Sequence, residues 1–121
     1  MTPFGQHMRT LRREKNVSQK EMAKAIGVSA AYLSALEHGK RGKPSWSLLQ
    51  RIAGYFNVIW DDAELLQSKA DLSDPRVIID TSDLSATATE AANVLRDKIA
   101  HMNDKQLEEL RDHLSRIRRN R

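Results

Sequence analysis

The chain has 121 residues, of which 40% are hydrophobic, 5% are aromatic and none is cysteine. This length suits one compact domain with an extension, and its core must be mostly aliphatic. The lack of cysteine excludes disulfides, thiolate catalysis and cysteine-based zinc sites. The apolar runs are far too short to cross a membrane and no basic-then-apolar leader opens the chain, so we expect a soluble cytoplasmic protein.

Charge divides the chain into stretches of opposite sign. Residues 1–60 carry ten Lys and Arg against three Glu, a net charge of +7. Residues 61–115 carry six basic and thirteen acidic side chains, a net charge of −7, and four arginines follow in the last six residues. A basic head on an acidic body is typical of a module that binds a polyanion. Composition alone does not distinguish such a module from a solvated surface of uneven charge.

The first helix is predicted over about residues 4–15, where Met8, Leu11 and Arg12 recur at helical spacing. Asn16 and Val17 interrupt the pattern. A break of this kind before the next apolar-periodic stretch predicts that a separate helix follows.

The second and third helices have clear start and stop signals. Ser18, with Glu21 three residues later, has the pattern of a capping box, and Gly27 suits a left-handed helix end. Ser29 then caps a third helix, which ends at Gly39. The second helix is expected to bury Met22, Ala23 and Ile26.

Residues 27–29, Gly-Val-Ser, are the whole connection between these two helices. So tight a turn prevents antiparallel packing, so the helices must cross at a steep angle, which is the helix-turn-helix geometry. Ala23 on one helix and Ala31 or Ala35 on the other would let the two axes approach. A generic helical bundle would instead have longer helices and looser connections.

Two further helices complete the predicted head. A basic loop leads to Pro44 and Ser45, which open a fourth helix that runs through Phe56. Its inner side is expected to comprise Leu48, Leu49, Ile52, Ala53 and Phe56. A fifth short helix is predicted from about Trp60 to Leu66, which gives a five-helix domain over residues 1–66.

Residues 67–83 are predicted to form a linker with one short strand. The linker contains turn-prone residues, and its Arg-Val-Ile-Ile-Asp stretch at 76–80 has strand propensity. A lone strand is marginal in water and needs a partner. Two alternatives stay open: the stretch pairs with its copy in a second subunit, or Val77 and Ile79 cover the head.

The predicted fold class is all-α, because residues 84–121 are helical again. From about Ser85 an apolar stripe comprises Ala88, Ala92, Leu95, Ile99 and Met102. Asn103 and Asp104 break it, and Asp104 is the expected N-cap of the last helix. That helix carries a two-heptad apolar seam of Leu107, Leu110, Leu114 and Ile117.

These two helices are predicted to form the dimerisation region. A head of 66 residues does not need their apolar surface, and two heptads are too short for an independent coiled coil. We therefore expect a helical hairpin that packs against its twin, through Leu95, Ile99, Met102, Leu107, Leu110, Leu114 and Ile117. The alternative is a monomer whose tail satisfies itself.

Residues 8–41 read MRTLRREKNVSQKEMAKAIGVSAAYLSALEHGKR, and residues 43–58 read KPSWSLLQRIAGYFNV. This text resembles the XRE-type, lambda-repressor-like helix-turn-helix family of transcriptional regulators. The matching pattern covers about half of the chain and constrains many positions at once. The resemblance implies a head that binds double-stranded DNA with its third helix in the major groove.

The resemblance also implies roles for individual side chains. Gln19, at the start of the second helix, would hydrogen-bond a backbone phosphate beside the unpaired N–H groups of that helix end. The groove-facing residues of the third helix would be Ser29, Ala30, Ala31, Ser34 and Ala35, with Tyr32 at the flank. Alanine contacts a thymine methyl group but forms no bidentate hydrogen bond, so we expect specificity to depend also on the basic loop and on DNA shape.

Basic side chains around this helix are the expected phosphate contacts: Lys20, His38, Lys40, Arg41 and Lys43. Lys20 is the weaker candidate, and Arg41 could bind the edge of a guanine instead of a phosphate. The alternative for the loop lysines is that they belong to a solvated turn and do not contact DNA. The resemblance further implies that Arg12 and Glu37 form a structural ion pair, since Glu37 near DNA would otherwise repel phosphate.

The sequence thus predicts a non-enzymatic, sequence-specific repressor that binds a palindromic operator as a homodimer and is associated with the nucleoid when bound. No catalytic triad or glycine-rich phosphate loop is present, and the four histidines lack metal-ligand spacing, so no catalytic residue, metal or cofactor is expected. Two alternatives stay open. An antitoxin would autoregulate its operon through the same head and bind a toxin with its C-terminal half, and an interaction module would bind an acidic protein.

Overall fold

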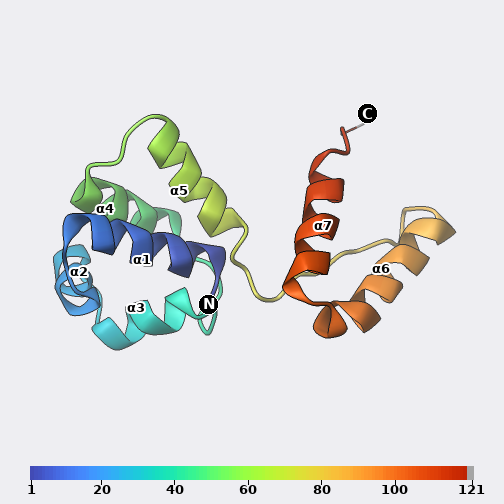
Figure 1. The fold of residues 1–121 in the computed structure, drawn as a ribbon, viewed down its shortest axis with the longest axis horizontal. Helices are drawn as coiled ribbons and strands as arrows, with labels where there is room; N and C mark the ends of the chain where they lie inside the picture. The colour runs from blue at the N-terminus through green and yellow to red at the C-terminus, as the bar shows by residue number, and fades with distance from the viewer. Residues whose placement is uncertain (120–121) are drawn as a thin grey trace. The chain divides into compact units, whose positions relative to one another are not determined.

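The computed structural model describes residues 1–119, and over this range the chain is helical with no strand (Figure 1). The helices are α1 (Pro3–Lys15), α2 (Gln19–Ile26), α3 (Ala30–Glu37), α4 (Trp46–Phe56), α5 (Asp61–Asp71), α6 (Ala86–Lys98), the 3-10 helix η1 (Ile99–His101) and α7 (Asp104–Ser115). They divide into two compact units, residues 1–77 and residues 78 onward. The predicted all-α fold class is confirmed.

The predicted start and stop signals of α2 are present as hydrogen bonds. The Ser18 hydroxyl accepts from the Glu21 N–H at 3.0 Å, and the Glu21 carboxylate accepts from the Ser18 N–H at 3.1 Å. Gly27 ends the helix with φ of 80°, a left-handed conformation that costs glycine little.

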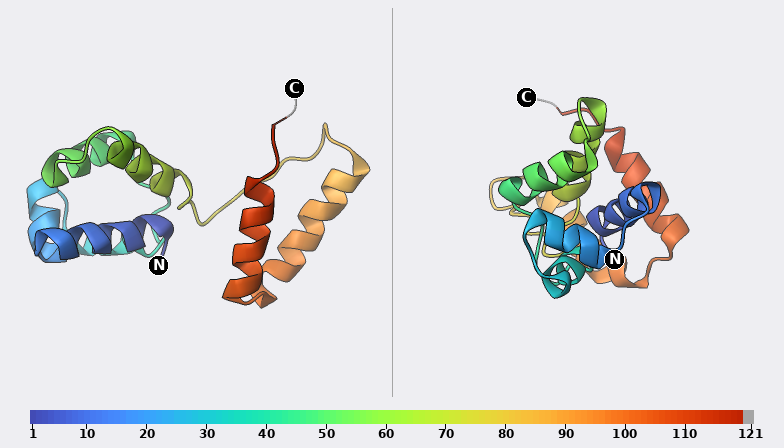
Figure 2. Two further views of the ribbon diagram at one scale, coloured as in Figure 1. Left: turned by 45° about the horizontal axis from the view of Figure 1, so that its top comes forward. Right: turned by 90° about the vertical axis from the view of Figure 1, so that its left-hand side faces the viewer.

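A single core joins the five helices of the first unit (Figures 1 and 2). In it, α1 packs against α3 and α5, and α2 packs against α3 and α4. The core is aliphatic apart from one phenylalanine, as the composition predicts, and it includes all three predicted α2 residues. Its buried hydrophobic members are Phe4, Met8, Met22, Ala23, Ile26, Leu33, Leu36, Leu48, Leu49, Ile52, Leu66 and Ala70.

Helix α5 continues to Asp71, so the first five residues of the predicted linker are helical. Ala70 is buried in the core. Ser73 is buried too, because its hydroxyl accepts from the Phe4 N–H at 2.8 Å and donates to the Lys69 carbonyl at 2.6 Å. These contacts attach the end of α5 to the start of α1, and sequence patterns carry no signal for contacts between residues so far apart.

The stretch at 76–80 is neither helix nor strand. Val77 and Ile79 are both largely exposed. The short strand predicted at 76–80 is therefore not formed in the described chain.

The second unit is a pair of helices joined by η1. The helical pattern begins near Ser85 as predicted, and Ser85 is the N-cap of α6, but the N-cap of α7 is Asn103 rather than Asp104. Asn103 adopts the extended conformation that a cap requires and forms a reciprocal capping box with Gln106. Because α7 ends at Ser115, Ile117 lies beyond the helix that was predicted to carry it.

The helices of the second unit leave their apolar sides uncovered. In Figures 1 and 2, α6 and α7 diverge from η1 as the two arms of a V. Of the described residues 78–119, none is buried. None of the helices described combines the length and the apolarity needed to cross a membrane.

Candidate nucleic-acid interface

Helices α2 and α3 meet at the tight corner formed by residues 27–29. The Val28 N–H donates to the Ala23 carbonyl at 3.0 Å, which closes the end of α2. The Ser29 hydroxyl accepts from the Tyr32 N–H at 3.0 Å and so begins α3. Leu33 and Leu36 point into the core from α3. This is the helix-turn-helix geometry, and it leaves the opposite side of α3 facing outward.

The outward side of α3 carries small side chains. Ala31 and Tyr32 are exposed, and Ser34 and Ala35 are half-buried. Ala30 is half-buried as well but packs against the core, so less of it is open than the sequence pattern suggests. Ser29 uses its hydroxyl oxygen as the helix cap, while the hydroxyl hydrogen stays available for donation.

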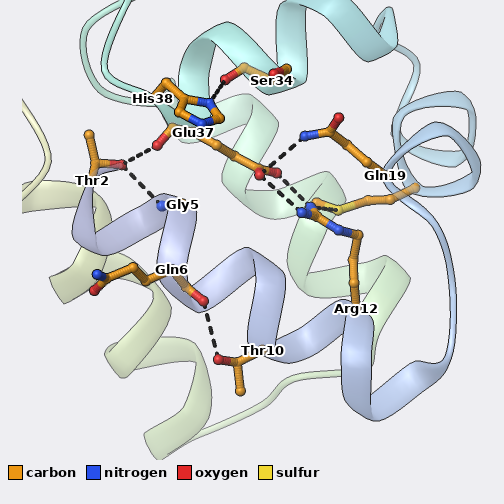
Figure 3. Close-up of polar contacts among 10 residues, drawn as sticks. Thr2, Gly5, Gln6, Thr10, Arg12, Gln19, Ser34, Glu37 and His38 are labelled. Atoms are coloured by element: carbon orange, nitrogen blue, oxygen red, sulfur yellow. Dashed lines mark hydrogen bonds and ion pairs between the residues drawn. The ribbon is translucent and has the colours of Figure 1, made fainter.

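A buried polar network holds α3 from behind (Figure 3). Glu37 is 0% exposed, and its carboxylate accepts two hydrogen bonds from the Arg12 guanidinium, the Nη2–Oε1 distance being 3.0 Å. The Gln19 side-chain nitrogen also donates to Glu37 Oε1, at 3.2 Å. The Arg12–Glu37 pair thus joins α1 to the end of α3, and Gln19 adds α2 to the same network.

The Gln19 side chain is therefore not entirely free to bind a phosphate. Its side chain is half-buried, and one of its two amide hydrogens is used by Glu37. The second amide hydrogen remains for another acceptor. The predicted phosphate contact of Gln19 would thus couple directly to the ion pair behind α3.

The start of α1 approaches the end of α3 closely. The Thr2 N–H and hydroxyl both donate to the Glu37 carbonyl at 3.0 Å, and the Thr2 hydroxyl accepts from the Gly5 N–H (Figure 3). A Cβ atom at Gly5 would overlap the Glu37 carbonyl oxygen. Sequence reasoning missed Thr2 and Gly5, and the one available signal was a glycine inside a predicted helix.

The basic loop after α3 presents three exposed cations, Lys40, Arg41 and Lys43. The Arg41 guanidinium carbon lies 5.9 Å from the centroid of the Tyr32 ring, a cation–π distance that ties the loop to α3. Lys43 Nζ lies 3.8 Å from Asp71 Oδ1, and both side chains are half-exposed. Lys20 is also exposed, on α2. The predicted basic residues thus lie on α2 and on the loop that follows α3.

His38 is the C-cap of α3 and turns back onto its own helix. Its Nδ1 lies 2.9 Å from the Ser34 carbonyl oxygen (Figure 3). A carbonyl only accepts, so Nδ1 carries the hydrogen and Nε2 is left as an acceptor in the neutral ring. His38 would donate to a phosphate through Nε2 only when its ring is protonated.

Comparison with known proteins gives one matching family model. A model described as a helix-turn-helix domain matches residues 3–66. This range contains α1–α4 and the first half of α5, and it includes the α2–α3 corner, the Arg12–Glu37 pair and the basic loop. No solved structure matches the chain.

Several bacterial and phage proteins are similar to part of the chain. An uncharacterized HTH-type transcriptional regulator, RghRB of Bacillus subtilis (strain 168), is 36% identical over 62 residues, which are 51% of this chain and 45% of that protein. The HTH-type transcriptional repressor RghR of the same strain is 40% identical over 53 residues, 44% of this chain and 39% of that protein. The ImmF control region 10 kDa protein of Bacillus phage phi105 is 46% identical over 55 residues, 46% of this chain and 60% of that protein.

The similarity therefore covers less than two thirds of the length of each of these relatives. The family model, by contrast, spans more than half of this chain and coincides with the α2–α3 corner and its supporting helices. The chain belongs to the XRE-type helix-turn-helix family.

Proposed function

We propose that the chain is a sequence-specific transcriptional repressor that binds a palindromic operator in double-stranded DNA as a homodimer. The observation that carries this proposal is the outward side of α3. It is open, uncharged and backed by the buried Arg12–Glu37 pair, and exposed cations flank it. A helix presented in this way fits the major groove, with the cations placed for phosphates on either side.

The repressor role draws on the relatives. RghR is named as a repressor and RghRB as a regulator, and each resembles part of this chain. Occupation of the promoter is the proposed route of repression. Ser29, Ala30, Ala31, Tyr32, Ser34 and Ala35 are the proposed base-reading or groove-lining residues, and Gln19, Lys20, His38, Lys40, Arg41 and Lys43 are the proposed phosphate contacts.

The open V of α6 and α7 supports the proposed homodimer. Val94, Ile99 and Leu114 are about half-exposed, and Leu95, Met102, Leu107 and Leu110 are only half-buried. Two helices without a fully buried side chain lack the apolar burial that stabilises a folded unit. A second copy of the same V would cover these residues and bring two heads onto one palindrome.

DNA selected from a random pool by the full-length protein tests the DNA-binding part of the proposal. We expect inverted repeats whose half-sites lie about 34 Å apart, one helical turn, or a multiple of this distance. Ala31→Asp places a negative charge on the outward side of α3 and should abolish retention. Ala91→Asp makes the same change on exposed α6 and should leave it intact. Equal binding by both variants, or selected DNA without symmetry, contradicts the proposal.

Sedimentation equilibrium tests the dimer separately. Leu110→Lys should shift the protein to the mass of a monomer and weaken operator binding, because the half-buried leucine faces the proposed partner. Glu109→Lys, its exposed neighbour on α7, adds the same side chain and should leave the dimer intact. A wild-type chain that is monomeric at micromolar concentration, yet binds its operator tightly, would disprove the dimer.

A further inference from the structure

Three consecutive apolar side chains lie exposed where the first unit ends and the second begins along the chain. Val77 is 74% exposed, Ile78 is 92% exposed and Ile79 is 57% exposed. Valine and isoleucine are strong strand formers, and three in a row on the surface form an unusual apolar stretch. Pro75 precedes this stretch, and Arg76 and Asp80 flank it.

The backbone of this stretch has unused hydrogen-bonding capacity. Within the described range, no backbone-to-backbone hydrogen bond starts or ends at residues 74–80. Side chains satisfy two groups at the margins: the Asp74 carboxylate accepts from the Arg76 N–H at 3.0 Å, and the Asp80 carboxylate accepts from the Ser82 N–H at 2.9 Å. The N–H and C=O groups of Val77, Ile78 and Ile79 are thus open to a strand partner.

We infer that residues 76–80 pair with the same residues of a second copy of the chain, as a two-stranded antiparallel ribbon. The sequence Arg-Val-Ile-Ile-Asp is complementary to itself when reversed. With the two-fold axis at Ile78, Arg76 lies opposite Asp80 of the partner subunit, and Val77 lies opposite the partner's Ile79. Every charge then meets its opposite, and every apolar residue meets an apolar residue.

The hydrogen bonds already present select one of the two possible ladders. Because the Arg76 N–H is used by Asp74, the bonded pairs fall at Val77 and Ile79, which gives four backbone hydrogen bonds across the two-fold axis. Arg76 then lies in a non-bonded pair, where opposite side chains are closest. Hydrogen bonds from the Ser82 hydroxyl and N–H lower the pKa of Asp80, so its carboxylate is charged near neutral pH.

The ribbon rests on the proposed homodimer. A two-stranded ribbon of this length is marginal in water by itself. Once α6 and α7 hold two copies together, the strands meet at a high effective concentration and pairing becomes a local step. Opposite charges at the two ends, such as Arg76 and Asp80, are expected for a strand that pairs antiparallel with its own copy. They are not needed for a strand that adds to a sheet of another protein.

Cysteine cross-linking of the full-length protein tests the register. The described chain has no cysteine, so a single introduced thiol reports one position. Ile78→Cys places two thiols opposite each other across the axis, about 4.5 Å apart at Cα, and should form a disulfide-linked dimer under mild oxidation. Val77→Cys places its two copies roughly 8–9 Å apart at Cα, too far for a disulfide, and should stay uncross-linked. Thr87→Cys, exposed on α6, controls for random collision.

Charge reversal gives an independent readout. Arg76→Asp or Asp80→Arg alone places like charges opposite each other at both ends of the ribbon, and should weaken dimerisation about tenfold. The double variant restores opposite charges in the same register and should return the dimerisation constant to within about twofold of wild type.

The outcomes separate this inference from the homodimer itself. A wild-type dimer in which Ile78→Cys does not cross-link, or cross-links no better than Val77→Cys and Thr87→Cys, overturns the ribbon and leaves the homodimer standing. A wild-type monomer overturns both. A dimer whose single charge reversals are neutral, and which binds another protein through residues 76–80, assigns the stretch to a different partner and also overturns the ribbon.

Discussion

Glu37 lies where α1, α2 and α3 meet, and it is the buried carboxylate of the head. Arg12 and Gln19 both donate to it, so its charge is paired and hydrogen-bonded away from water. Removing one partner from such a pair leaves an uncompensated charge in the interior, which costs far more than the loss of an exposed pair. The pair therefore holds the end of α3 in place.

Glu37→Gln should lower the free energy of unfolding by about 3 kcal/mol, because Arg12 would keep its charge without a carboxylate. Urea denaturation followed by circular dichroism measures this change. Asp71→Asn is the matched control, since it breaks the half-exposed pair with Lys43 and should cost less than about 0.5 kcal/mol. Losses of similar size in the two variants would show that burial does not determine how much the Arg12–Glu37 pair contributes to the free energy of unfolding.

Trp60 has a backbone conformation that suits glycine. Its φ is 54° and its ψ is −125°, and its side chain is 81% exposed, so little packing offsets the strain. Trp60→Gly should raise the free energy of unfolding by about 1 kcal/mol. Trp46→Gly should instead lower it by about 0.5–1 kcal/mol, because Trp46 is exposed but helical. Thermal melts of both variants check the opposite signs, and a destabilised Trp60→Gly would disprove the strain.

Among the helices, local signals predicted the starts and ends well. Ser18, Gly27 and Ser29 occupy the cap positions expected of them, because a cap depends on residues only a few positions away. The end of α5 was missed, because the contacts of this region, the burial of Ala70 and the bond between Ser73 and Phe4, join residues far apart in the sequence. Asn103 and Asp104 are both good caps, and the pattern alone did not choose between them.

The candidate site, like the helices, was predicted in part. The outward side of α3 was implied by the family resemblance, and in the structure Ala31 and Tyr32 are exposed on it. The bond from Gln19 to Glu37 and the return of His38 to Ser34 were not predicted. Both depend on side-chain torsions, which no residue pattern specifies.

The contact of α1 with α3 depends on a glycine. Gly5→Ala would drive a Cβ into the Glu37 carbonyl, and the nearby Met1 side chain would also have to move. We expect the free energy of unfolding to fall by at least about 2 kcal/mol, since the obstacle is backbone. Gly54→Ala, in the last turn of α4 with no neighbouring atom within 4 Å of the added Cβ, should raise it by about 0.5–1 kcal/mol. Chemical denaturation distinguishes them, and a stabilised Gly5→Ala would contradict the close approach.

Taken as a unit, residues 1–77 should lose stability in mild acid. Burial lowers the pKa of His7 and nearby Lys69 lowers it further, while Glu14 and Asp62 oppose the shift. The unfolded chain then binds more protons than the folded one at pH values just below 6.5, so stability rises with pH through this window and falls on acidification. His7→Gln should flatten the dependence between about pH 5.5 and 7.5. An unchanged slope in the His7→Gln variant would show that His7 is not the source of the pH dependence.

The proposed homodimer would make the folding of α6 and α7 depend on the abundance of the protein. If that unit gains its apolar burial only from a second copy, its melting follows mass action, and its midpoint temperature rises with the protein concentration. The unit formed by residues 1–77 has its own core, so its midpoint is independent of concentration. A dilute sample would then melt in two steps, one for each unit. As the protein concentration rises, the step of the second unit would move to higher temperature, so that it merges with the step of the first unit or passes it. In a cell, a newly made chain would then have a folded first unit before it met the second copy that stabilises α6 and α7.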